Sequence, residues 1–161
     1  MKMIDLADSR KLEDQSKQFS LARQQATNFK PLVLVAENHD DTRLMVKYFL
    51  EMSGFRVAEA TDGENAVRLA EQSHPDLVLI DVSLPLLDGI AVTRHFRQSV
   101  SLPNLPVIFI SAHAELRLRN EALAAGGNDY LVKPLDLKLL ESAVEKHICR
   151  ESGYGLFTEI L

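Results

Sequence analysis

Polar side chains with complementary chemistry stand at the ends of four short apolar runs in the sequence. They are Glu37 and Asn38, then Asp81, then Ser111, and then Lys133. Carboxylate and amide oxygens are ligands that a hard cation such as Mg²⁺ prefers. A hydroxyl and an ammonium can bind phosphoryl oxygens, and an aspartate can accept a phosphoryl group to give an aspartyl phosphate. Together these side chains supply the parts that phosphoryl transfer requires, with Asp81 as the candidate acceptor.

The apolar run before Asp81 is typical of a strand that is buried on both faces. Residues 77–80 are all aliphatic and lack the alternation of a half-exposed strand, as in the middle of a parallel sheet. In open α/β sheets, ligands bind beyond the carboxyl ends of the strands. The position of Asp81 is therefore one where chemistry is expected.

From Pro31 onward, short apolar runs alternate with longer amphipathic segments, which is typical of βα units around a parallel sheet. We therefore expect an α/β fold, with the short and charged second strand at an edge of the sheet. The expected strands are residues 32–36, 55–60, 77–80, 107–110 and 130–132.

The expected helices lie between and after these strands. The first follows an acidic turn, residues 37–41, and stops near Gly54, while the second begins with Thr61 and Glu64 at the spacing of a capping box. Later helices are expected at residues 88–98, with Asp88 as a cap, and at 114–125 and 135–150. The predicted buried stripe of the first helix consists of Leu44, Met45, Tyr48, Phe49 and Met52.

The composition is that of a globular protein, with 46% hydrophobic and 25% charged residues and a formal net charge of −5. No apolar run reaches the roughly 20 residues of a membrane helix, and the amino terminus lacks the apolar block of a signal peptide, so we expect a cytoplasmic protein. The lack of a long basic run argues against direct binding to nucleic acid. The single cysteine, Cys149, offers neither a disulfide nor a metal cluster.

Changes in composition divide the chain into three expected parts. Residues 1–30 form a polar extension that is flexible or partly helical, residues 31–150 form the folded domain, and residues 151–161 form a tail. No second globular unit is visible in the sequence. We therefore expect the output to come from a separate molecule.

Four motifs in order, VLVAEN, LIDVSLPLLDG, VIFISA and YLVKP, resemble the receiver domain of two-component response regulators. The resemblance runs from residue 32 to about residue 150. It implies a doubly wound sheet of five parallel strands in the flavodoxin-like order 2-1-3-4-5, with helices on both faces. It also implies a stand-alone phosphorelay protein, a monomer or weak dimer, whose only chemistry is its own phosphorylation and dephosphorylation.

The resemblance assigns roles to the residues at the strand ends. Asp81 would accept a phosphoryl group from a histidine kinase or a phosphotransfer protein, and Ser111 and Lys133 would bind that group. Tyr130 would switch together with Ser111 and alter a surface that binds a downstream protein partner. The peptide bond between Lys133 and Pro134 is similar to one that is often cis in the family. The implied ligands of Mg²⁺ are Glu37, Asn38, Asp81 and the backbone carbonyl of Ser83.

Asn38 departs from the receiver pattern, which usually has an acid at this position. An amide keeps an oxygen ligand but loses a charge, so we expect weaker Mg²⁺ binding and slower transfer. Asp40 and Asp41 follow closely, but they are better interpreted as acids that cap the first helix. Ser111 has two interpretations, the hydroxyl that captures the phosphoryl group and an ordinary helix cap.

Two other functions remain open. If Asn38 prevents the site from binding metal, the chain would be a pseudo-receiver scaffold that acts by phosphate-independent protein–protein interaction. The presence of Asp81, Ser111 and Lys133 counts against this alternative. A flavin-binding protein or a phosphatase of related layout is disfavoured. The acidic turn at residues 37–41 would repel a flavin phosphate, and a phosphatase of this kind needs its nucleophile on the first strand.

Overall fold

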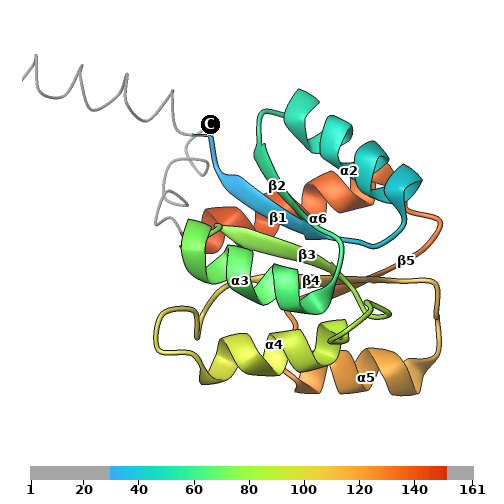
Figure 1. Cartoon of the computed structure of the whole chain (residues 1–161). Helices are drawn as coiled ribbons and strands as arrows, with labels where there is room; N and C mark the ends of the chain where they lie inside the picture. The colour runs from blue at the N-terminus through green and yellow to red at the C-terminus, as the bar shows by residue number, and fades with distance from the viewer. Residues whose placement is uncertain (1–29, 152–161) are drawn as a thin grey trace, which may run out of the picture. The chain divides into compact units, whose positions relative to one another are not determined.

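The computed structural model describes residues 30–151, and in them a parallel sheet carries helices on both faces (Figure 1). The predictions for the extension up to residue 29 and for the tail from residue 152 lie outside the described residues. In chain order the elements are β1 (Leu32–Ala36), α2 (Asp40–Met52), β2 (Arg56–Ala60), α3 (Gly63–Ser73), β3 (Leu77–Asp81), α4 (Gly89–Gln98), β4 (Val107–Ser111), α5 (Leu116–Ala124), β5 (Asp129–Val132) and α6 (Leu137–Glu151).

The five strands follow the order β2-β1-β3-β4-β5, and every neighbouring pair is parallel. This confirms the predicted fold class and places β2 at an edge, as its charged sequence indicates. β3 lies at the centre of the sheet between β1 and β4, and Leu77 to Ile80 have no exposed surface. The uninterrupted aliphatic run before Asp81 is therefore core on both faces.

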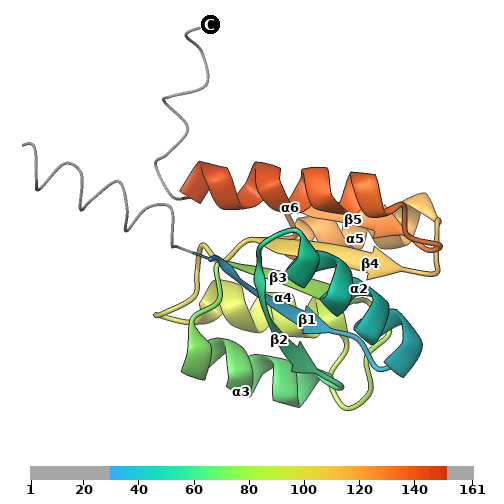
Figure 2. The same ribbon diagram turned by 90° about the horizontal axis from the view of Figure 1, so that it is seen from above.

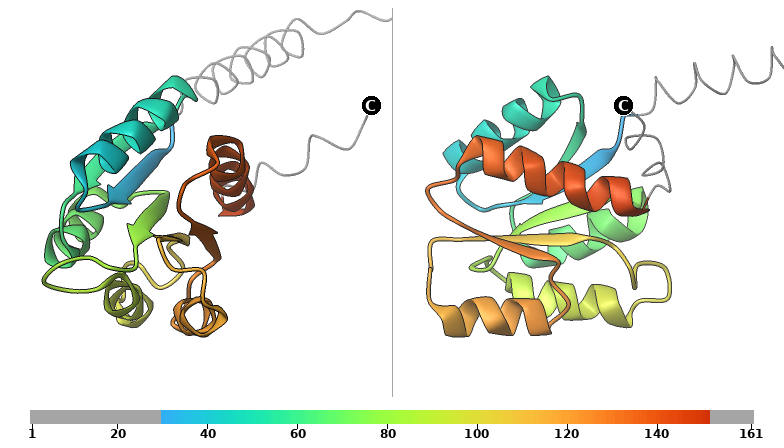
Figure 3. Two further views of the ribbon diagram at one scale, coloured as in Figure 1. Left: turned by 90° about the vertical axis from the view of Figure 1, so that its right-hand side faces the viewer. Right: turned by 180° about the vertical axis from the view of Figure 1, so that it is seen from behind.

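Each face of the sheet carries its own layer of apolar side chains. α3, α4 and α5 cover one face, where Phe96 and Ala122 pack on Leu34 and Phe109. α2 and α6 cover the other face, where Val46, Leu50, Leu140 and Val144 pack on Val33 and Leu79. Figures 2 and 3 show the two helical layers from the side: Figure 2 has α6 above the sheet and α3 below it, and Figure 3 has α4 and α5 beneath it.

The predicted buried stripe of α2 is wrong for four of its five residues. Leu44, Met45, Tyr48 and Met52 are 39%, 43%, 59% and 89% exposed, and only Phe49 packs against the core as predicted. The sheet is instead contacted by Val46 and Leu50, which are fully buried. Both sides of this helix carry apolar residues at helical spacing, so the periodicity alone offered two solutions.

Three helix starts show how the local sequence sets the ends of the elements. The capping box predicted at Thr61 is wrong by one residue, because Asp62 is the N-cap of α3 and its side chain accepts a hydrogen bond from the amide of Asn65. Asp88 caps α4 as predicted. The backbone amides of Lys138 and Leu139 donate hydrogen bonds to the side chain of Asp136. α6 therefore begins at Leu137, later than the predicted residue 135.

Among the helices of residues 30–151, none combines the length and the apolar character that crossing a bilayer requires. The peptide bond between Lys133 and Pro134 is cis, as the resemblance implied.

Candidate active site

The candidate residues lie along the carboxyl edge of the sheet. β1 and β3 are neighbours, but the chain leaves β1 for β2 on one side and leaves β3 for β4 on the other, so their ends flank a topological switch point. Glu37 directly follows β1, and Asp81 is the last residue of β3. Ser111 ends β4 opposite Val132 of β5, which places Lys133 just beyond the same edge.

The ammonium of Lys133 bridges two buried acids. Its Nζ lies 2.7 Å from Oε2 of Glu37 and 2.5 Å from Oδ2 of Asp81. Glu37 has no exposed surface and Asp81 is 4% exposed. Burial lowers the pKa of the Lys133 ammonium, but its hydrogen bonds to Asp81 and Glu37 outweigh burial and raise that pKa above its ordinary value. Lys133 therefore carries a positive charge at neutral pH.

Backbone amides hold the other oxygen of each acid. Oδ1 of Asp81 accepts a hydrogen bond from the amide of Ser83 at 2.7 Å, and Oε1 of Glu37 accepts one from the amide of His39 at 2.9 Å. Each carboxylate is thus fixed by one charged and one neutral donor, while the second lone pair of each oxygen stays available. The two side chains are oriented before any ligand arrives.

Two glycines, Gly63 at the start of α3 and Gly89 at the start of α4, lie too close to the segment from Asp81 to Leu87 to carry a side chain. A Cβ at Gly89 would lie 2.4 Å from the backbone oxygen of Asp81, and a Cβ at Gly63 would lie 1.8 Å from that of Leu87. Real side chains do not tolerate such distances, so both positions require glycine. These contacts hold the residues that follow Asp81 against α3 and α4.

The oxygen atoms near Asp81 are of the kind that Mg²⁺ prefers. Within residues 30–151, no cluster of three or more His, Cys, Asp or Glu side chains suits a metal ion. Glu37 and Asp81 are close enough to share one ammonium, and exposed Asn38 and Ser83 follow Glu37 and Asp81 closely on the adjoining turns. Two carboxylates, an amide oxygen and a backbone carbonyl form an all-oxygen set that a hard cation prefers, with one charge fewer than three acids would give.

Ser111 does not cap a helix. The N-cap of α5 is Glu115, while Oγ of Ser111 accepts a hydrogen bond from the amide of His113 at 3.0 Å. The helix-cap interpretation of Ser111 is therefore wrong. Since its oxygen is the acceptor in this turn, the hydroxyl proton of this buried residue is left to donate to a further group.

Tyr130 contacts the same turn from β5. Its hydroxyl donates to the backbone oxygen of His113 at 2.8 Å, and its ring packs against Phe109 with centroids 6.4 Å apart. The side chain is only 6% exposed. Ser111 and Tyr130 are thus joined through one residue, His113, by two hydrogen bonds.

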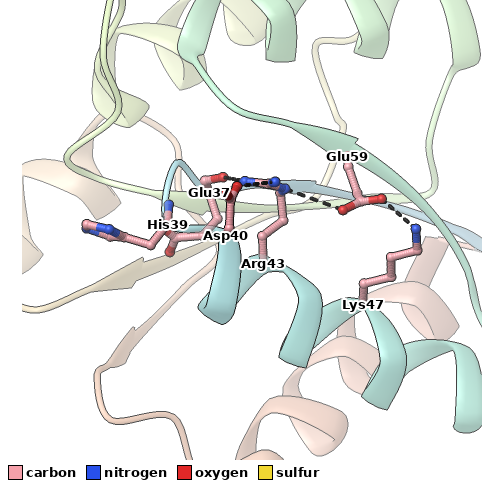
Figure 4. A network of polar contacts seen from close by, with 6 residues as sticks. All are labelled: Glu37, His39, Asp40, Arg43, Lys47 and Glu59. Atoms are coloured by element: carbon pink, nitrogen blue, oxygen red, sulfur yellow. Dashed lines mark hydrogen bonds and ion pairs between the residues drawn. The ribbon is translucent and has the colours of Figure 1, made fainter.

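Sequence reasoning missed Arg43, which contacts the turn after β1 from α2. Nη1 of Arg43 donates to the backbone oxygen of Glu37 at 3.0 Å, and its other nitrogens contact Asp40 and Glu59 (Figure 4). The spacing of Asp40 and Arg43 on one helix is a local signal. The contacts with Glu37 and Glu59 depend on how α2 lies against β1 and β2.

A family model for the response regulator receiver domain matches residues 33–145. The transcriptional regulatory protein PrrA of Mycobacterium tuberculosis is 37% identical over 123 residues, which are 76% of this chain and 52% of PrrA. The alkaline phosphatase synthesis transcriptional regulatory protein PhoP of Bacillus subtilis is 36% identical over 120 residues, which are 74% of this chain and 49% of PhoP. The chain spans about half the length of these curated relatives.

The receiver domain of the sensor histidine kinase PA1611 from Pseudomonas aeruginosa, which has a magnesium ion coordinated in its active site cleft, superposes with a TM-score of 0.70. It is 33% identical, and the match covers 74% of this chain and 98% of that one. The receiver domain of the Francisella response regulator 1452 has a TM-score of 0.72 at 32% identity, with 76% of this chain and 99% of that one covered.

Proposed function

This chain belongs to the response regulator receiver domain family, and from that membership we propose that Asp81 accepts a phosphoryl group from a histidine kinase or a phosphotransfer protein. One oxygen of the Asp81 carboxylate forms a bond to phosphorus while the bond from phosphorus to the donor's imidazole nitrogen breaks. The product is an aspartyl phosphate. The observation that carries this proposal is the Asp81 carboxylate itself, fixed at a strand end between the Lys133 ammonium and the Ser83 amide.

Lys133 and Ser111 are suited to bind the phosphoryl oxygens. The raised pKa of Lys133 keeps its ammonium charged, and a charged donor binds phosphoryl oxygens strongly in a partly buried site. The Ser111 hydroxyl has a free proton to donate because its oxygen already accepts from His113. Ser111 lies at the end of β4, next to the strand that carries Asp81, and Lys133 lies just beyond the end of β5, one strand further along the sheet.

Glu37, Asn38, Asp81 and the Ser83 backbone carbonyl are the proposed ligands of Mg²⁺. When bound, the ion neutralises negative charge on the phosphoryl oxygens. The PA1611 receiver domain, at 33% identity, has a magnesium ion in its active site cleft, which supports the same site here. With Asn38 in place of an acid, we expect weaker Mg²⁺ binding than a site with three carboxylates gives.

We propose that phosphorylation reaches the surface through Ser111 and Tyr130. A phosphoryl group that draws the Ser111 hydroxyl moves the turn at His113, and this turn is the hydrogen-bond partner of the Tyr130 hydroxyl. The affected surface, formed by α5, β5 and α6, would bind a downstream protein partner, not nucleic acid directly, in a cytoplasmic monomer or weak dimer. Among the side chains that the structure describes, its large exposed apolar residues are Leu116, Val132 and Leu139.

Intact-mass measurement after incubation with acetyl phosphate and Mg²⁺ tests the proposal, with Asp81→Asn as the control. We expect the wild-type chain to gain one phosphoryl group and the variant to gain none. No gain in either protein, even at high Mg²⁺, would contradict phosphate acceptance. That result would favour the second candidate function, a pseudo-receiver scaffold. The observation that favours this candidate is Asn38, which replaces an acid in the proposed metal site.

A further inference from the structure

Arg43 connects the turn that carries two of the proposed metal ligands, Glu37 and Asn38, to two secondary-structure elements. Its Nη1 donates to the backbone oxygen of Glu37 at 3.0 Å, its Nη2 to Oδ1 of Asp40 at 2.5 Å and its Nε to Oε1 of Glu59 at 3.3 Å. Figure 4 shows the guanidinium among these three acceptors, which come from the turn, the first turn of α2 and β2. The side chain is 12% exposed.

The bond to the Glu37 carbonyl bears on the site because that carbonyl belongs to the peptide that joins Glu37 to Asn38. A charged donor on this oxygen restrains the rotation of the peptide plane, and the orientation of that plane is one of the torsions that place the Asn38 side chain. Within residues 30–151, the Asn38 side chain itself has no hydrogen-bond partner. Its placement as a ligand therefore depends on the backbone that Arg43 holds.

The charge of Arg43 is balanced locally. Asp40 and Glu59 face the guanidinium, and their contacts hold the pKa of Arg43 above its ordinary value, with the Asp40 hydrogen bond as the largest cause. Glu59 is shared with Lys47, whose Nζ lies 2.6 Å from Oε2 of Glu59. Arg43 can thus orient the turn while these acids offset the repulsion that its charge would exert on a cation.

We infer that Arg43 is a positioning residue for the Mg²⁺ site. It affects the Mg²⁺ affinity by holding the Glu37–Asn38 peptide and does not contact the ion. The inference rests on the proposed metal site of the preceding section. It goes beyond that site because it assigns a determinant of affinity to a side chain on α2. Partners of metal ligands in the outer shell are generally worth about 10- to 100-fold in affinity.

The test compares Arg43→Met with Lys47→Met. Both variants remove a cation that contacts Glu59 from the same helix, but only Arg43 also contacts the Glu37 carbonyl. Mg²⁺ is titrated into isotope-labelled protein, and the backbone and side-chain amide resonances of Asn38 report binding directly by NMR. We expect Arg43→Met to weaken Mg²⁺ binding by about tenfold and Lys47→Met to leave it within about twofold.

A second variant, Arg43→Lys, keeps the charge, but its three N–H donors share one nitrogen and cannot reach all three acceptors that surround the planar guanidinium, so we expect an intermediate loss of affinity. If Arg43→Met does not fold, Arg43→Lys takes its place in the Mg²⁺ titration. Equal affinities in Arg43→Met and Lys47→Met, or unchanged affinity in Arg43→Lys, would overturn the inference, as would a wild-type chain that binds no Mg²⁺. If Mg²⁺ binds and depends on Arg43 but acetyl phosphate gives no phosphorylation, the inference stands and the proposed function fails.

Discussion

At the scale of single residues, one ammonium forms ion pairs with two buried carboxylates. Lys133 contacts both Glu37 and Asp81, so the three charges leave the site with a net negative charge. Such a site attracts a cation and gains stability when one binds. The same ammonium is the positive charge available to an incoming phosphoryl group. The charge balance of the site thus suits both proposed ligands.

Replacing Lys133 by Met is expected to destabilise the folded chain. The change leaves Glu37 and Asp81 facing each other without a counter-charge, and loss of one partner from a buried ion pair costs about 3 kcal/mol. The free energy of unfolding in urea measures this cost. Adding Glu37→Gln to Lys133→Met should recover part of it by removing the repulsion. Unchanged stability in the single variant would contradict the account of the charge balance.

Replacing Asn38 by Asp is expected to act in opposite directions on metal binding and on stability without metal. A further carboxylate should tighten Mg²⁺ binding by about tenfold, because charged ligands tune the affinity for hard cations. Without Mg²⁺ it adds repulsion near Glu37 and Asp81, so the free energy of unfolding should fall. Calorimetric Mg²⁺ titration and urea unfolding with and without Mg²⁺ measure both. Equal Mg²⁺ affinity in the two proteins would show that position 38 is not a ligand.

At the scale of elements, α2 carries apolar residues on two sides. Val46 and Leu50 face the sheet, whereas Tyr48 and Met52 face away from the core. The orientation of the helix also brings Arg43 to the Glu37 carbonyl and to Glu59. The side of α2 that contacts the sheet therefore determines the packing and the support of the candidate site together.

Leu50→Ala and Met52→Ala form a matched pair that tests this orientation. Truncating fully buried Leu50 leaves a cavity and should cost about 2–5 kcal/mol of unfolding free energy. Truncating Met52, which is 89% exposed, should change it by no more than about 0.5 kcal/mol. Urea unfolding of both variants measures the difference. Similar costs at the two positions would mean that the helix packs through the other side.

The sequence predicted the strands well because four of the five are short apolar runs with a polar residue at or just after their end. For the same reason it predicted that Asp81 and Lys133, which stand where such runs stop, lie at one edge of the sheet, where the structure brings their side chains into contact. It failed at the packed side of α2, where two apolar stripes compete. It also missed Arg43, because the contact with Glu59 joins residues from two elements and no spacing within one element encodes it.

At the scale of the whole molecule, one edge of the sheet gathers the polar groups and a neighbouring surface exposes apolar ones. The strand order could be predicted only from the resemblance to receiver domains, because alternating strands and helices are compatible with several orders. Hydrogen bonds join Ser111 to His113 and His113 to Tyr130, and these connect the edge to the surface of α5, β5 and α6. This connection is the physical basis of the proposed switch.

Tyr130→Phe is expected to separate phosphorylation from switching. The variant keeps the ring that packs on Phe109 but loses the hydroxyl that donates to His113. Phosphorylation by acetyl phosphate should stay within about twofold of wild type, because Asp81 and Lys133 are untouched. The changes in amide chemical shift of α5, β5 and α6 on phosphorylation should shrink. Full-sized changes in the variant would exclude the Tyr130 hydroxyl from the switch.

The central claim is that Asp81 is the residue that becomes phosphorylated, and chemical trapping tests it most directly. Borohydride reduces an aspartyl phosphate to homoserine and releases inorganic phosphate, while ordinary carboxylates do not react. After incubation with acetyl phosphate and Mg²⁺, reduction and peptide mapping should find homoserine at position 81 and at no other aspartate. The reduced residue at another position, or its absence from a chain whose intact mass shows phosphorylation, would contradict the account.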